Sequence, residues 1–132
     1  MTRFLLDTNT VSAAIKGHPN VVRQLEALPT GAPGISAITE GELLFGLAKR
    51  PEAKRLASVV REFLRCVEVF PWDHSVAEYY GTLRAEMERR GKGLGAPDLL
   101  IAAHAMALGR VLVTSDRAFG QVDGLRVVDW TA

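Results

Sequence analysis

The chain has 132 residues, of which 48% are hydrophobic and 23% are charged, and its 16 Lys and Arg residues against 15 Asp and Glu leave a net charge of +1. These are the values of an ordinary globular domain. They exclude a disordered tail, a collagen-like fibre and a coiled coil, and they argue against a protein that binds nucleic acid by bulk positive charge. A nucleic-acid enzyme with a local basic rim stays open. We expect one domain over residues 1–132.

Short apolar segments with the character of strands alternate with helices along the chain. Asn20 is expected to cap the second helix, and Pro51 and Pro97 suit the first turns of the helices that they open. In chain order, we expect a strand at 3–6, helices at 8–16 and 21–28, a strand at 34–37, helices at 39–47 and 51–64, a strand at 67–70, helices at 75–90 and 97–108, and strands at 111–113 and 126–128. This alternation predicts an α/β fold, a three-layer α/β/α sandwich around a central parallel sheet of about five strands.

No segment of the sequence has the length and character of a membrane anchor. The N-terminal apolar stretch is too short for a signal peptide, and the apolar run 99–108, which contains His104, is too short to span a bilayer. Cys66 is the only cysteine, which excludes an internal disulfide, and its apolar neighbours predict a small core residue. His104 is likewise expected in the core. We expect a soluble, cytoplasmic protein.

Four acidic residues stand where strands end or helices begin. Asp7 directly follows the first strand, and Asp116 closely follows the fourth. Glu42 and Asp98 fall in the first turns of the helices predicted at 39–47 and 97–108. Because the functional crevice of a parallel α/β sheet lies outside the carboxyl ends of its strands, we expect these four side chains to meet there.

Each acidic residue also has a purely structural interpretation. Asp7 and Asp116 can cap the turns that follow them, Asp98 suits the positive end of a helix dipole, and Thr39 with Glu42 matches a capping box. Four converging carboxylates repel one another, however, and a divalent cation relieves that repulsion. Ligands that are all oxygen favour Mg²⁺ or Mn²⁺ over zinc. Without a P-loop or a nucleophile elbow, such a site indicates metal-assisted hydrolysis of a phosphate ester.

Several segments carry a family resemblance as well: Leu5–Asn9 with Ser12, Thr39-x-x-Glu42-Leu43-x-x-Gly46, Gly95–Ala105, Leu112–Asp116 with Phe119, and Val128–Trp130. In this order, and in a chain of this length, they resemble the PIN-domain ribonucleases of the VapC type, which are the toxins of type II toxin–antitoxin pairs. The resemblance spans nearly the whole chain. It implies a PIN-like fold and a toxin that is an Mg²⁺-dependent endoribonuclease, with Mn²⁺ as a substitute, hydrolysing RNA phosphodiester bonds.

The resemblance also assigns roles to the acidic residues and their neighbours. Asp7 and Asp98 are the expected metal ligands, Glu42 would hold water as a ligand or a base, and Asp116 would complete the pocket. Asp116 stands where many relatives carry Asn, so its direct ligation is the least secure. Four neighbouring side chains either orient carboxylates and water or cap helices and turns: Thr8, Asn9, Thr114 and Ser115.

The implied partners are RNA, a VapB-like antitoxin that blocks the acidic site, and a second copy of the chain, in a homodimer or a toxin–antitoxin hetero-oligomer. The amphipathic helices at 51–64 and 75–90 are the candidate contact surfaces. Two basic clusters can bind RNA phosphates: Lys49, Arg50, Lys54 and Arg55, and Arg84, Arg89, Arg90 and Lys92. The second is favoured because its loop leads directly into Asp98. Trp72, Tyr79 and Tyr80 are candidate base-stacking residues, with core packing expected for at least two of them.

Two other functions remain open at this point. The segment Asp7–Thr10 superficially resembles the nucleophile motif of haloacid-dehalogenase phosphatases, but Asn9 stands where that chemistry needs a carboxylic acid. A degenerate, non-catalytic PIN module that only binds a partner is the other alternative, and the intact set of four acids argues against it. The sequence does not identify the RNA target, the number of metal ions or the antitoxin.

Overall fold

The computed structural model describes all 132 residues, and a five-stranded sheet with the order β3-β2-β1-β4-β5 lies at its centre. Every pair of neighbouring strands is parallel, and in the middle of the sheet Leu5 pairs with Gly34 on one side and Leu112 on the other. The strands are β1 (Phe4–Leu6), β2 (Pro33–Ser36), β3 (Glu68–Phe70), β4 (Val111–Val113) and β5 (Val127–Val128). The predicted fold class is confirmed.

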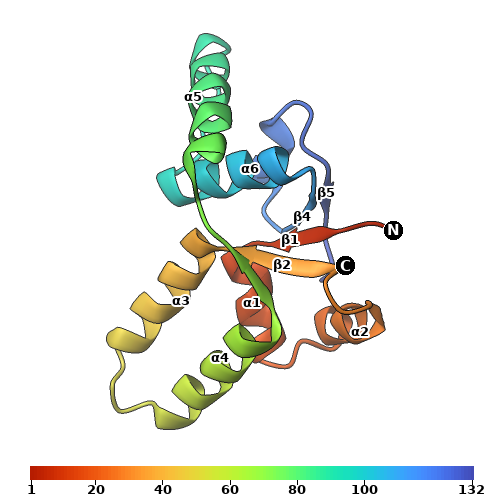
Figure 1. Ribbon diagram of the computed structural model, residues 1–132, viewed down its shortest axis with the longest axis vertical. Helices are drawn as coiled ribbons and strands as arrows, with labels where there is room; N and C mark the ends of the chain where they lie inside the picture. The colour runs from red at the N-terminus through yellow and green to blue at the C-terminus, as the bar shows by residue number, and fades with distance from the viewer.

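Helices cover both faces of this sheet, and α5 with α6 lies on the side opposite α1–α4 (Figure 1). The reason is visible in β1: Leu5 faces one core cluster and Leu6 the other, because successive side chains of a strand point to opposite faces. The helices are α1 (Thr8–Ile15), α2 (Pro19–Ala27), α3 (Ala37–Ala48), α4 (Lys54–Cys66), α5 (His74–Arg89) and α6 (Ala96–Leu108), and a 3₁₀ helix, η1, spans Arg117–Gln121.

The strand order reverses direction at β1. The chain moves outward from β1 to β2 and β3, then crosses back to place β4 and β5 on the other side of β1. In open parallel sheets, such a switch point is where the connections diverge and leave a crevice at the carboxyl ends of the strands. The crevice here lies beside the ends of β1 and β4, which Asp7 and Thr114 directly follow.

Three helix starts differ from the sequence prediction by two or three residues. Helix α2 begins at Pro19 with His18 as its N-cap residue, so Asn20 lies inside the helix instead of capping it. Helix α4 begins at Lys54 because Arg50–Ala53 form the turn that reverses the chain after α3, and Pro51 belongs to that turn. Helix α3 begins at Ala37 because the Ser36 hydroxyl caps it by accepting a hydrogen bond from the Ile38 amide at 3.0 Å.

The earlier start of α3 also overturns the capping-box interpretation of Thr39 and Glu42. Thr39 is the third residue of α3, and Glu42 lies in its second turn and not its first. Neither side chain is therefore at the position that could satisfy the first free amide groups of the helix. Both are available for contacts with other elements.

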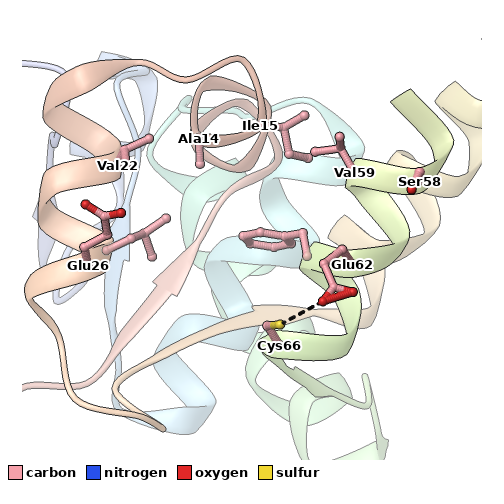
Figure 2. A pocket seen from close by; sticks show the side chains of 10 residues that line it. Ala14, Ile15, Val22, Glu26, Ser58, Val59, Glu62 and Cys66 are labelled. Atoms are coloured by element: carbon pink, nitrogen blue, oxygen red, sulfur yellow. Dashed lines mark hydrogen bonds between the residues drawn. The ribbon is translucent and has the colours of Figure 1, made fainter. Parts of the chain in front are cut away.

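Cys66, predicted to be in the core, is exposed. It is the last residue of α4, a strongly amphipathic helix whose buried residue is Val60. Strand β3 begins only at Glu68, so Cys66 still belongs to the helix. The helical periodicity of α4 places its side chain on the exposed side of that helix. Its sulfur lies 3.9 Å from a Glu62 carboxylate oxygen, at the edge of a surface groove (Figure 2).

No helix combines the length and the apolar character needed to cross a bilayer.

Candidate active site

Three of the four acidic residues selected from the sequence act electrostatically on the fourth, Asp98. Burial raises the pKa of Asp98, and the negative charges of Asp116, Asp7 and Glu42 raise it further. Because Coulomb interactions weaken with distance, these three carboxylates are the charged groups that surround Asp98. Asp98 itself projects from the first turn of α6.

Asp7 is the most buried of the four, with 4% of its surface exposed. It caps α1, since one carboxylate oxygen accepts a hydrogen bond from the Thr10 amide at 2.8 Å. Its own amide donates to the Val113 carbonyl at 3.1 Å, which fixes Asp7 against the end of β4. The capping role and a ligand role are compatible, because the second carboxylate oxygen makes no hydrogen bond within the chain.

Glu42 is held by a residue of the neighbouring helix α1. The Thr8 hydroxyl donates a hydrogen bond to Glu42 Oε1. The hydroxyl oxygens of Thr8 and Thr39 lie 3.3 Å apart, so a polar chain runs between α1 and α3 beside the acidic residues. Thr8 thus orients a carboxylate, one of the two roles expected for it. Thr39, which the sequence analysis treated only as a cap, also contributes to the site.

Asp116 is exposed and caps η1, with Oδ1 accepting a hydrogen bond from the Ala118 amide at 2.9 Å. The buried Thr114 hydroxyl accepts from the Asp116 amide at 3.0 Å, so Thr114 shapes the turn that presents Asp116. Asn9 and Ser115 are exposed, and neither makes a hydrogen bond to an acidic residue of the site.

The negative charge of the site is not compensated by the protein. None of its four carboxylates takes part in an ion pair; the five ion pairs of the chain involve other residues. As the side chains stand, no three His, Cys, Asp or Glu residues are close enough to enclose a metal ion. The donor chemistry nevertheless fits a hard divalent cation, since every candidate ligand is a carboxylate oxygen and Asp98 has no basic neighbour.

A buried contact behind the site joins the two helices that carry Glu42 and Asp98. His104 on α6 is fully buried, and its Nδ1 lies 2.7 Å from the hydroxyl oxygen of Ser36, the N-cap residue of α3. Burial lowers the pKa of His104, so the ring is neutral at pH 7. The core position predicted for His104 is confirmed, whereas the role of Ser36 was missed. The sequence signal for Ser36 was a serine directly before a helix.

Comparisons with known proteins agree with this arrangement. A family model described as the PIN domain matches residues 4–125, which include all four acidic residues. The chain is 39% identical over 131 residues to the tRNA(fMet)-specific endonuclease VapC of Salmonella typhimurium, covering 98% of this chain and 99% of that protein. It is 37% identical over 132 residues to the protein of the same name from Shigella flexneri, covering 99% of this chain and all of that one. The chain belongs to the VapC family of PIN-domain proteins.

Solved structures of the family superpose on this VapC homologue over almost its whole length. The crystal structure of VapBC2 from Rickettsia felis bound to a promoter DNA fragment matches with a TM-score of 0.91 at 34% identity, covering 98% of this chain and 99% of that one. DNA-bound VapBC from Salmonella typhimurium matches with a TM-score of 0.90 at 39% identity and the same coverage. These matches confirm the PIN-like fold.

Proposed function

We propose that this VapC homologue is an Mg²⁺-dependent endoribonuclease that acts as the toxin of a type II toxin–antitoxin system. The observation that carries the proposal is the convergence of three carboxylates on Asp98 with no basic side chain to neutralise them. A cluster of this kind is costly in a folded protein unless a cation binds there. Because its proposed substrate is RNA, we propose that the protein acts in the cytoplasm.

The proposed roles follow from how each carboxylate is held. Asp7 is buried and Asp98 half-buried, so these two are the proposed ligands of Mg²⁺, with Mn²⁺ as a substitute. When bound, the ion would supply charge stabilisation at the phosphate and a more acidic water. Glu42, fixed by Thr8, holds and orients the attacking water or accepts its proton. Asp116, exposed and held in its turn by Thr114, closes the pocket on the solvent side.

The substrate class is suggested by the relatives. Two proteins that are 39% and 37% identical to this chain over their full lengths are named for cleavage of tRNA(fMet). We therefore propose transfer RNA, with initiator tRNA first among the candidates, as the substrate to test.

The proposed partner is a VapB-type antitoxin, since two matched structures are VapBC complexes and a third, 29% identical to this chain, is described as a toxin–antitoxin complex from Klebsiella pneumoniae. An apolar groove of about 550 Å³ lies between α1, α2 and α4, where Ile15, Val22 and Val59 point into it (Figure 2). Val59 is 43% exposed and belongs to a lining in which seven of ten residues are hydrophobic, so the apolar side chains form a continuous surface. We propose this groove as part of the antitoxin surface.

The alternatives gain no support from the geometry. A haloacid-dehalogenase phosphatase needs a second acid two residues after its nucleophile, and Asn9 at that position is exposed and makes no hydrogen bond to the site's carboxylates. A non-catalytic binding module does not require four acids around one point. Both remain outcomes of the experiment that tests the proposal.

The test is cleavage of tRNA by antitoxin-free protein with Mg²⁺, with Mn²⁺ and with EDTA. Glu42→Gln is expected to lose cleavage, and Glu40→Gln, a matched change on the same helix, is expected to cleave like the parent because Glu40 is not among the charges around Asp98. Asp98→Asn controls for contaminating nuclease. Cleavage that survives Asp98→Asn or EDTA would overturn the proposal, and a phosphoenzyme trapped on Asp7 would favour the phosphatase.

A further inference from the structure

A second groove of about 300 Å³ opens directly from the acidic site. Thr8 and Glu42 line it at one end, and it continues away from them between α1, α3 and α4. Apolar side chains, among them Leu43, Leu47 and Val60, contribute to its lining. The groove is therefore a continuation of the proposed active site and not a separate cavity.

Three cations stand at the far end of this groove: Lys16, Lys49 and Arg50. None of them forms an ion pair. The Lys49 ammonium lies 4.7 Å from the centre of the Phe45 ring, a contact that positions the side chain and leaves its charge in place. At 1.5 Å per residue of helix, the three cations lie about 10–12 Å along α1 and α3 from Thr8 and Glu42.

The helix dipole accounts for part of this pattern but not for all of it. Lys16 and Lys49 are the C-cap residues of α1 and α3, where a positive charge is favourable by roughly 0.3–1 kcal/mol. That effect explains a cation at each helix end. It does not explain why both ends, together with Arg50, line one groove that leads to an acidic site.

The other basic cluster, favoured from the sequence, is neutralised within the protein. Arg84 pairs with Glu88 at 3.0 Å, and Arg89 and Arg90 both pair with Glu86. Arg90 also pairs with Asp123. Only Lys92 of that cluster has no ion-pair partner. A phosphate would have to displace carboxylates at this surface, whereas at the groove it would meet unpaired cations.

Gly46 keeps the groove open beside Glu42. It lies one helical turn after Glu42, and a Cβ placed on it would meet no atom within 4 Å. Packing therefore does not require glycine here, and helix propensity disfavours it by about 1 kcal/mol relative to alanine. Because Gly46 lines the groove, a side chain at this position would take up space in it.

We propose that the groove between α1, α3 and α4 is the path of the RNA strand into the active site, with Lys16, Lys49 and Arg50 binding the phosphates that flank the cleaved bond. The inference rests on the ribonuclease function proposed above. Charge complementarity selects RNA as the occupant, since three unpaired cations suit a polyanion. These residues bind substrate and take no part in the chemical step, so their removal is expected to raise KM and leave kcat nearly unchanged.

The test is binding of a fluorescent tRNA at several salt concentrations by the Asp98→Asn chain, which is expected to bind RNA without cleaving it. The triple variant Lys16→Gln, Lys49→Gln, Arg50→Gln is expected to lose affinity about tenfold or more and to lower the slope of log K against log salt by about 2. The matched triple variant Arg84→Gln, Arg89→Gln, Lys92→Gln removes the same charge from α5 and the loop that follows it. It is expected to change affinity by less than about twofold.

A second pair of variants tests the shape of the groove. Gly46→Gln places a side chain in it, and cleavage is expected to fall through KM. Gly41→Gln on the same helix, exposed and also without a neighbour within 4 Å, is expected to cleave like the parent. Thermal unfolding of each variant shows whether the fold is retained.

The outcomes separate the two proposals. If the parent neither binds nor cleaves RNA, the ribonuclease function fails and this inference falls with it. If the parent binds and cleaves but the groove triple variant binds equally well, only the inference is overturned. Retained RNA affinity with a weakened antitoxin complex would overturn it as well, and would assign the groove to the protein partner.

Discussion

His104 Nδ1 lies 2.7 Å from Ser36 Oγ, and this buried contact links α6, which carries Asp98, to the N-cap residue of α3, which carries Glu42. Both side chains are fully buried. The ring also lies edge-on to Phe70, and its Nε2 has no hydrogen-bond partner. A proton on both nitrogens would therefore place an unpaired N–H and a charge in the core, which explains why burial lowers the pKa of His104.

The lowered pKa of His104 predicts that stability falls in mild acid. Below about pH 6.5 the unfolded chain binds a proton on this residue that the folded chain does not bind, so the free energy of unfolding decreases as the pH falls. Above that pH His104 is neutral in both the folded and the unfolded chain, so it causes no further change in the free energy of unfolding. The measurement is urea unfolding at about pH 5.5 and 7.5. The free energy of unfolding of the parent is expected to differ between the two pH values, and most of that difference is expected to disappear in His104→Gln.

The control for this experiment is His74→Gln, which removes an exposed histidine at the start of α5. It is expected to unfold like the parent at both pH values. An unchanged pH dependence in His104→Gln would show that the histidine is not the group responsible.

The uncompensated charge around Asp98 predicts that the metal-free protein is less stable than its packing allows. The pKa of Asp98 is raised by burial and by its three acidic neighbours, so the destabilisation grows as the pH rises from the ordinary aspartate pKa through that raised pKa. Asp98→Asn removes this repulsion. In EDTA at low salt, it is expected to raise Tm by a few degrees, because about 1 kcal/mol shifts a domain of this size by about 4 °C.

Added Mg²⁺ should reverse the order of the two proteins. The parent is expected to gain Tm with rising Mg²⁺ concentration, because a cation that binds only the folded state stabilises it. Asp98→Asn is expected to gain little. A Tm that rises equally in both proteins would mean that the ion acts elsewhere on the molecule. Calorimetric titration of the metal gives an independent readout of the same difference.

The link between Thr8 and Glu42 predicts a loss of activity without a loss of fold. Thr8→Val keeps the shape of the side chain and removes the hydroxyl that donates to Glu42. Residues that orient a metal-site carboxylate typically contribute about 10–100-fold, so kcat/KM for RNA cleavage is expected to fall by that factor. Thr82→Val, at an exposed position of α5, is the matched control. Equal rates for the two variants would contradict an orienting role for Thr8.

The sequence was sufficient to predict the fold and the acidic residues for a physical reason. Strand and helix periodicities determine the alternation of elements, and parallel strands bring the residues after them to one edge. Asp7, Glu42, Asp98 and Asp116 were therefore predictable from their places beside strand ends and helix starts. Asp7, Glu42 and Asp116 act electrostatically on Asp98, although no three of the four are close enough to enclose a metal ion, and Glu42 lies two residues deeper in its helix than its sequence position indicated.

Features that depend on packing between distant segments were not predictable. The cap of α3 is Ser36 and not Thr39. The basic cluster of Arg84, Arg89, Arg90 and Lys92 was favoured as an RNA-binding surface, but Glu86, Glu88 and Asp123 form ion pairs with its arginines. Cys66 follows the helical period of α4 rather than the apolar run in which it stands. The two grooves arise only where three helices pack together, which local periodicity does not describe.

The two grooves predict how an antitoxin would inhibit this chain. Ile15 lines both, so the surface between α1, α2 and α4 adjoins the one that leads to Glu42. A partner held in the first groove is therefore well placed to obstruct the second. Val59→Asp introduces a charge on the exposed apolar side of the first groove and is expected to weaken antitoxin binding by about tenfold or more, since an unpaired charge at an apolar contact is costly.

Cleavage by free Val59→Asp is expected to match the parent, because Val59 lines neither the acidic site nor the groove that leads to it. In the presence of antitoxin, the variant should then retain activity at antitoxin concentrations that silence the parent. Tyr79→Asp, which places the same charge at an exposed position on the opposite side of the sheet, is the control and is expected to remain inhibited. Full inhibition of Val59→Asp would exclude this groove from the antitoxin surface and leave inhibition to contacts at the active site alone.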